Sequence, residues 1–167
     1  MRGSRSGELV SRCIVETGTS SYYSALKDAV EEPVLKEVCR NIAADEFRHY
    51  KLFYTYLLRY LEAERIGSFG RFLAAAARIR ESEDDELAYA YYAANHPADA
   101  VYERKRFIRA YLSRAYRFYR PPHIERGIGM ILKAVGITPN SRLNVVLTRS
   151  IAWMLRLRVQ RLARAAT

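Results

Sequence analysis

The spacing of apolar residues predicts helix along most of the chain. Between residues 8 and 29, apolar side chains recur at steps of three and four residues, as at Tyr22, Leu26 and Ala29, which is the period of an amphipathic helix. A proline then favours the first turn of a second helix, which is predicted over residues 33–64. Because the connection is so short, the two helices are expected to form an antiparallel hairpin.

Four further helices are predicted downstream, and each is bounded by glycine, proline or a residue that can cap a helix. They cover residues 69–95, 102–119, 123–135 and a last segment that begins near Asn140. In the last helix, apolar residues form one stripe and arginines form another. We expect the apolar stripe to pack on the rest of the protein; the alternative is that this helix makes peripheral contact with an anionic membrane.

The composition agrees with a single helical domain. The chain has 167 residues, of which 50% are hydrophobic, and it contains 13 Tyr but only 8 Gly and 5 Pro. A chain of this length can bury one substantial core, and the scarcity of turn-forming residues favours long helices over a β architecture. The predicted fold class is all-α, with residues 1–167 as one domain, residues 8–64 as the hairpin and residues 68–167 as additional helices.

Basic residues gather in the C-terminal part of the chain. The formal net charge is +10, and residues 1–66 hold ten basic and ten acidic side chains, against eighteen and eight in residues 67–167. This asymmetry predicts an acidic partner and leaves open nucleic acid, an anionic membrane surface and an acidic protein. Basic and aromatic residues are interleaved over residues 104–120, but no recognised nucleic-acid-binding motif accompanies them. An acidic protein is therefore favoured over nucleic acid.

Two cysteines, Cys13 and Cys39, are present. They fall at levels about 16 Å apart on the two helices of the predicted hairpin, which is beyond the reach of a disulfide, so we expect buried thiols. The sequence also contains no apolar run long enough to span a bilayer and no signal segment. A cytoplasmic location is predicted.

The stretch IAADEFRHYKLF, residues 42–53, places a carboxylate and an imidazole three positions apart in a predicted helix. Positions i and i+3 lie about 60° apart around a helix and roughly 4.5 Å apart along it, so Glu46 and His49 can reach one cation. Such pairs are also common on solvated helix faces. Glu16, which lies in an apolar stretch, falls about level with this pair in an antiparallel hairpin, so three ligands from two helices are expected to converge.

Two segments resemble a known family: residues 15–23, VETGTSSYY, and residues 33–49, PVLKEVCRNIAADEFRH. They resemble the second half of the acyl-carrier-protein desaturases, which are ferritin-like di-iron proteins. In ferritin-like bundles a Glu from one helix and a Glu-x-x-His from its neighbour form one half of a di-iron carboxylate site. The string IAADEFRH carries the resemblance most strongly.

The resemblance implies a ferritin-like helical bundle in which Glu16, Glu46 and His49 bind iron and Asp45 accepts a hydrogen bond from an imidazole. Manganese is the alternative metal. The implied activity is the dioxygen-dependent oxidation of an acyl or similar apolar chain, with an acyl carrier protein as the acidic partner and a ferredoxin as an electron donor. The alternative function is a non-catalytic helical module that has lost the metal and binds an acidic protein or an anionic surface through its basic C-terminal part.

The sequence contains half of the expected ligand set. No Glu and Glu-x-x-His come before Glu16, and neither His96 nor His123 has a Glu three residues before it. The acidic cluster over residues 81–86 is expected to be solvated, because consecutive charges point all round a helix. We therefore expect either that the chain is the C-terminal piece of a longer protein, or that two copies form a homodimer in which each copy supplies three ligands.

Overall fold

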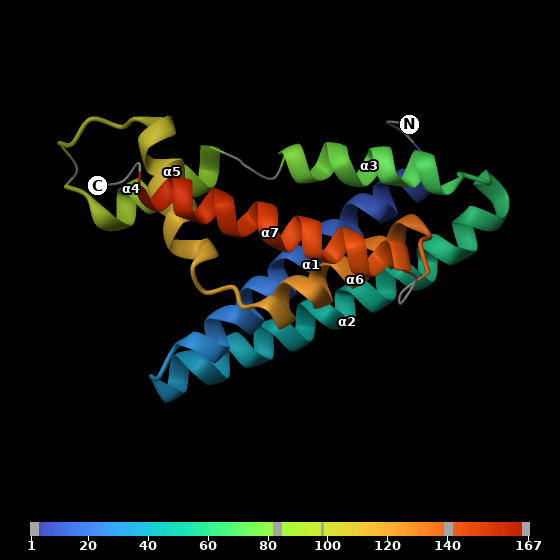
Figure 1. Cartoon of the computed structure of the whole chain (residues 1–167), viewed down its shortest axis with the longest axis horizontal. Coiled ribbons are helices and arrows are strands. Elements are labelled where there is room, and N and C mark those ends of the chain that lie inside the picture. The colour runs from blue at the N-terminus through green and yellow to red at the C-terminus, as the bar shows by residue number, and fades with distance from the viewer. Residues whose placement is uncertain (1–3, 82–84, 98, 139–141, 165–167) are drawn as a thin grey trace.

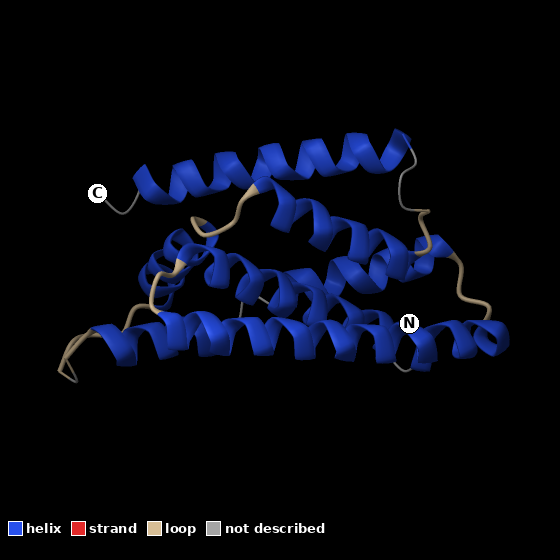
Figure 2. Ribbon diagram, turned by 90° about the horizontal axis from the view of Figure 1, so that it is seen from below, coloured by secondary structure: helices blue, strands red, loops and turns tan. Residues whose placement is uncertain are grey.

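A computed structural model describes residues 4–81, 85–97, 99–138 and 142–164, and every regular element within these ranges is an α-helix (Figures 1 and 2). The helices are α1 (Arg5–Ala29), α2 (Pro33–Glu64), α3 (Ser68–Glu81), α4 (Asp85–Asn95), α5 (Arg104–Tyr116), α6 (Pro121–Val135) and α7 (Arg142–Arg164). The predicted all-α class is confirmed. That the bundle is ferritin-like stays a prediction.

Helices α1 and α2 form the long antiparallel hairpin that the sequence predicts (Figure 1). At the turn, the Glu32 carboxylate accepts hydrogen bonds of 2.9 and 2.5 Å from two backbone N–H groups in the first turn of α2, which satisfies donors that the helix itself leaves free. At the far end, the Glu64 carboxylate accepts hydrogen bonds from the backbone N–H groups of Arg5 (3.1 Å) and Ser6 (2.9 Å). Glu64 thereby caps α1 from α2, and this contact helps to fix the register of the two helices.

The main core lies where α1, α2, α3 and α6 meet. Its buried side chains come from all four helices and are Val10, Ile14, Leu57, Ala75, Ile124, Ile128, Leu132 and Val135. Helix α6 approaches α1 closely at Gly127, where a Cβ atom would lie 3.0 Å from Oγ of Ser21. A side chain at this position would need the Ser21 side chain to move by a few tenths of an ångström. Close packing of the apolar surface between these helices is the main source of stability.

Helix α7 packs its apolar stripe on the same core, as predicted. Leu147, Ile151 and Leu155 contact the core cluster, whereas Trp153 and Met154 are exposed. Figure 2 shows α7 as an outer layer over the other helices. Among the described residues, none of the helices combines the length and the apolar character that a membrane crossing requires.

The structure describes two helices, α3 and α4, where the sequence predicts one helix over residues 69–95. Helix α3 lies against α1 and α6, whereas α4 packs against α5. Ala88 and Tyr92 of α4 and Phe107 of α5 form a second, smaller apolar cluster. The two halves of the predicted helix thus bury their apolar side chains against different partners. Residues 82–84, which include Glu83 and Asp84 of the acidic cluster, lie outside the described part of the chain.

Candidate metal centre

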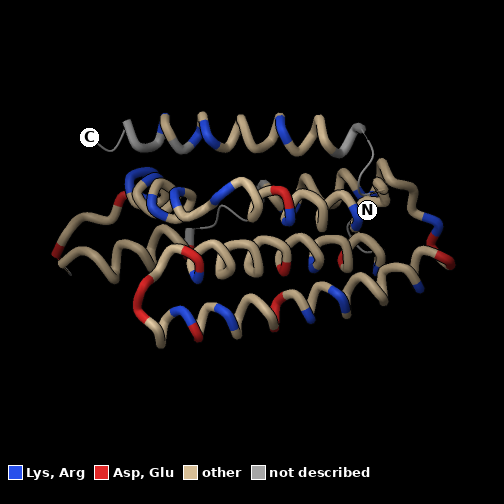
Figure 3. The backbone as a smooth tube through the Cα atoms, turned by 60° about the horizontal axis from the view of Figure 1, so that its bottom comes forward, with Lys and Arg blue, Asp and Glu red and all other residues tan. Residues whose placement is uncertain are grey.

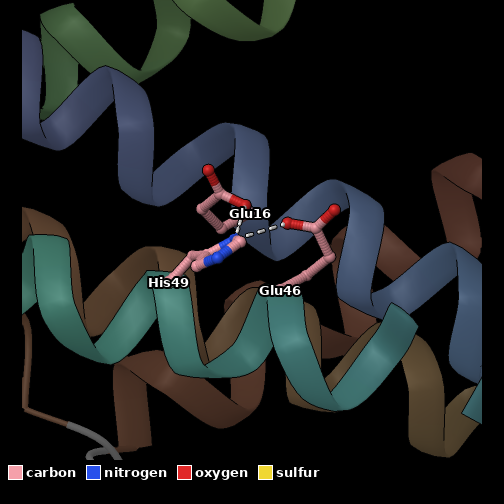
Figure 4. Close-up of side chains that lie close together, drawn as sticks. All are labelled: Glu16, Glu46 and His49. Carbon is pink, nitrogen blue, oxygen red and sulfur yellow. Dashed lines mark hydrogen bonds and ion pairs between the residues drawn. The ribbon is translucent and has the colours of Figure 1, made fainter. Parts of the chain in front are cut away.

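Three side chains that the sequence singles out meet between α1 and α2 (Figure 4). Glu16 projects from α1, and Glu46 and His49 project from α2. Nδ1 of His49 lies 3.2 Å from Oε2 of Glu46 and 3.8 Å from Oε2 of Glu16. Each residue offers one ligand atom, and the three atoms lie within 4.8 Å of one another. The structure thus brings together the three predicted ligand side chains.

The geometry of the hairpin explains why they meet. Glu16 and Glu46 are equally far along the chain from residue 31, which lies in the connection between α1 and α2. Antiparallel helices joined by so short a connection therefore place the two carboxylates at the same level. His49 follows Glu46 by three residues, which puts both side chains on one face of α2.

The site is closed on one side and open on the other. The side chains of Glu16 and Glu46 are 12% and 22% exposed, whereas that of His49 is 56% exposed. The two carboxylates therefore lie against the hairpin, and the imidazole stands at the rim. A ligand or a second protein surface can reach the three groups from the side of His49.

The electrostatics of the site favour a bound proton or cation. Burial, a hydrogen bond with Glu46 and the negative charge of Glu46 raise the pKa of Glu16 to about 7, although His49 acts in the opposite direction. Two carboxylates at this separation resist ionising together. Below about pH 7 a proton on Glu16 relieves their repulsion, and a metal ion can replace that proton.

Among the residues next to the site, the Arg12 guanidinium acts to lower the pKa of Glu16, whereas Cys13 and Tyr50 supply no charge. Burial and the nearby Glu16 raise the pKa of the Cys13 thiol to about 12. Burial also raises the pKa of Tyr50, whose hydroxyl donates a 2.8 Å hydrogen bond to the backbone carbonyl of Met130. Both groups therefore stay neutral near physiological pH. Cys13 and Cys39 are buried, free thiols, as the sequence predicts.

The donor set fits a divalent transition-metal ion. Two atoms that each lie about 2.1 Å from one cation are at most about 4.2 Å apart. The His49 nitrogen lies 3.2 and 3.8 Å from the two carboxylate oxygens, within this limit, and all three ligand atoms lie within 4.8 Å of one another. Two carboxylates and an imidazole are a combination that suits iron or manganese. The three side chains fill only part of the coordination sphere of such an ion.

Asp45 has a different partner from the one that the resemblance implies. Its carboxylate pairs with the guanidinium of Arg48 on the same helix, and both side chains are exposed. The Nδ1 atom of His49 faces the carboxylates of Glu16 and Glu46. The role of Asp45 in orienting an imidazole stays a prediction.

Sequence reasoning did not identify Cys13 and Tyr50 as neighbours of the site. Both positions carry a signal that could have found them, because Cys13 lies three residues before Glu16 and Tyr50 directly follows His49. Their burial against Met130 and Ala134 of α6 is a tertiary contact that the sequence of the hairpin does not contain.

Comparisons of this chain with protein-family models, with curated proteins and with solved structures find no match.

Proposed function

We propose that this chain is a non-haem iron protein of the di-iron carboxylate kind, an oxidoreductase that uses dioxygen to oxidise an acyl or similar apolar chain. The observation that carries the proposal is the convergence of Glu16, Glu46 and His49 within 4.8 Å of one another. The resemblance of residues 15–23 and 33–49 to the desaturases supports the reaction and the substrate class. Manganese is the alternative metal.

Each residue has a distinct part in holding the ion. Glu16 and Glu46 supply carboxylate oxygens, and unprotonated His49 supplies the nitrogen. Bound iron would supply the redox chemistry that activates dioxygen. The high pKa of Glu16, about 7, means that an incoming cation displaces a proton from the site, so metal binding tightens as the pH rises.

The basic C-terminal part offers a place for the acidic partners of such an enzyme. The sequence of α7 contains six arginines and no acidic residue, and Figure 3 shows basic positions alone marked on the described part of this helix. An acyl carrier protein or a ferredoxin, both acidic, would be attracted to this surface.

Metal loading tests the proposal directly. The purified protein is titrated with ferrous iron without oxygen, and bound iron is quantified after removal of the excess. We expect stoichiometric iron in the wild type and at least a tenfold loss of affinity in Glu46→Gln and in His49→Ala, because each removes a ligand atom. Admission of oxygen should then produce a ferric absorption band in the wild type alone.

A matched control lies on the same helix. Glu37 and Arg40 form an ion pair at the same three-residue spacing, so Glu37→Gln removes a carboxylate from α2 without touching the site. We expect this variant to bind iron as the wild type does. Absence of bound iron and manganese in the wild type would contradict the proposal and favour the non-catalytic helical module.

A further inference from the structure

Helix α2 has an apolar surface that the rest of the described chain does not cover. Val34, Val38, Leu52 and Tyr56 are 68%, 46%, 51% and 43% exposed, and their spacing places them on one face of the helix, together with His49. We call these four residues the α2 stripe. The stripe is an apolar pair near each end of α2, because exposed Asp45 and His49 lie on the same face between Val38 and Leu52. Isolated exposed apolar residues are ordinary, but two apolar pairs on one face of a helix favour an interaction surface.

The other side of α2 already faces the core. Cys39, Tyr50 and Leu57 are buried there, so the two apolar pairs of the α2 stripe lie on a side of α2 that the described part of the chain leaves open. An outward helix face of an isolated bundle is normally polar. The α2 stripe therefore suits a helix whose outer side also packs against a partner.

The charges of α2 favour a second copy of this chain as the partner. Residues 33–64 contain five basic and five acidic side chains, and Figure 3 shows both signs along the helix. Two copies of such a helix can meet across a two-fold axis without net repulsion. Two copies of α7, which contains arginines but no acidic residue, would repel each other.

The metal centre is incomplete on the same side. His49 lies between the two apolar pairs of the stripe and is 56% exposed, and the three side chains fill only part of the coordination sphere of iron or manganese. A second copy docked about a two-fold axis would bring another Glu16, Glu46 and His49. The combined set is two Glu residues from one pair of helices and two Glu-x-x-His motifs from the other pair, which is a full ligand set for two metal ions.

The size of the surface is sufficient for a dimer. Helix α2 has 32 residues, so it is about 48 Å long, and a contact strip about 10 Å wide on it covers roughly 500 Å² per copy. Two copies together would bury roughly 1,000 Å², which is the size at which a specific interface begins.

We propose that the α2 stripe docks a second copy of this chain about a two-fold axis, so that the Glu16, Glu46 and His49 groups of both copies face each other. The metal part of this inference rests on the proposed function, whereas the docking of the two copies does not. Four carboxylates brought together repel one another, so bound metal should tighten the dimer by linkage.

Sedimentation of the full chain tests the dimer, with and without manganese as a probe that needs no exclusion of oxygen. We expect a reversible dimer in which manganese lowers the dissociation constant at least tenfold. Leu52→Glu places a charge in the stripe and should weaken the dimer at least about a hundredfold. Leu58→Glu is the matched control, because Leu58 is 46% exposed but lies on a different side of α2; it should leave the dimer intact.

Val38→Glu is a second variant at the other end of the stripe, and circular dichroism shows whether each variant is folded. A folded, monomeric wild type at every concentration, or equal loss of the dimer in Leu52→Glu and Leu58→Glu, would overturn the inference. A dimer that binds no metal would contradict the proposed function but would support the docking of two copies through the α2 stripe. A monomer that binds one metal ion would support metal binding at the site but would contradict the docking of two copies.

Discussion

Replacing Glu16 by Gln should stabilise the metal-free protein at alkaline pH while it removes one ligand of the proposed metal site. Glutamine has nearly the shape of a protonated glutamate but cannot ionise. In the folded protein the pKa of Glu16 is about 7, raised from its usual value of 4.5 by burial and by the adjacent Glu46. Ionised Glu16 is therefore a cost to folding, and the variant removes that cost.

The raised pKa of Glu16 determines how the stability difference between the variant and the wild type changes with pH. Below about pH 4.5, Glu16 is protonated in both the folded and the unfolded chain, so the substitution changes little. As the pH rises towards 7, only the unfolded chain gains by ionisation, and the wild type loses stability. The difference in pKa corresponds to about 3 kcal/mol at most. Because water reaches the site beside the half-exposed His49, we expect about 1 kcal/mol.

Urea denaturation of the metal-free protein, followed by circular dichroism, measures this effect. Glu16→Gln should be more stable than the wild type near pH 8, and the gain should shrink steadily towards pH 5. Glu62→Gln, a change at an exposed carboxylate on α2, should show no such trend. Loss of stability in Glu16→Gln near pH 8 would refute the reasoning, because it would mean that the ionised carboxylate makes a favourable contact.

Three further predictions concern the hairpin and its packing. Leu57→Ala should cost about 2–5 kcal/mol in the free energy of unfolding because Leu57 is fully buried, whereas Leu58→Ala, beside it but exposed, should cost less than about 0.5 kcal/mol; urea denaturation compares them. Tyr50→Phe should cost about 1 kcal/mol by the same measurement, because it removes the buried hydrogen bond that the Tyr50 hydroxyl donates to the carbonyl of Met130. Glu64→Gln should lower the thermal midpoint at neutral pH but not in acid. Hydrogen bonds with Ser6 lower the pKa of Glu64 in the folded protein. The stability that ionised Glu64 contributes is therefore present above its unfolded-chain pKa of 4.5 and is lost as the pH falls. An equal effect of Glu64→Gln at both pH values would contradict this explanation.

The local features of the hairpin could be predicted because they depend on neighbours in sequence. Helical periodicity, the short connection at residues 30–32 and the proline that follows it define two long helices. The three-residue spacing of Glu46 and His49, with Glu16 at the same level of the other helix, then follows from helix geometry. These are consequences of the 3.6-residue repeat and of chain connectivity, so they hold before any tertiary packing is known.

Packing between distant segments could not be predicted in the same way. The sequence indicates one helix over residues 69–95, but the structure gives α3 and α4 different partners. The spacing of apolar residues indicates which face of a helix is apolar, but it does not indicate which other element covers that face. For the same reason the contact of Tyr50 with Met130, which joins α2 to α6 beside the candidate metal centre, has no signal in the sequence of either helix.

The sequence by itself determined the all-α class, the hairpin and the three side chains of the candidate centre, because each depends on residues close together in the chain or paired by one short turn. Only the tertiary structure decided which faces are covered. It buried Glu16 against the hairpin and raised its pKa, left His49 open to solvent, and left the α2 stripe exposed. These properties depend on how completely neighbouring helices exclude water from each side chain, and that exclusion is set by the whole fold.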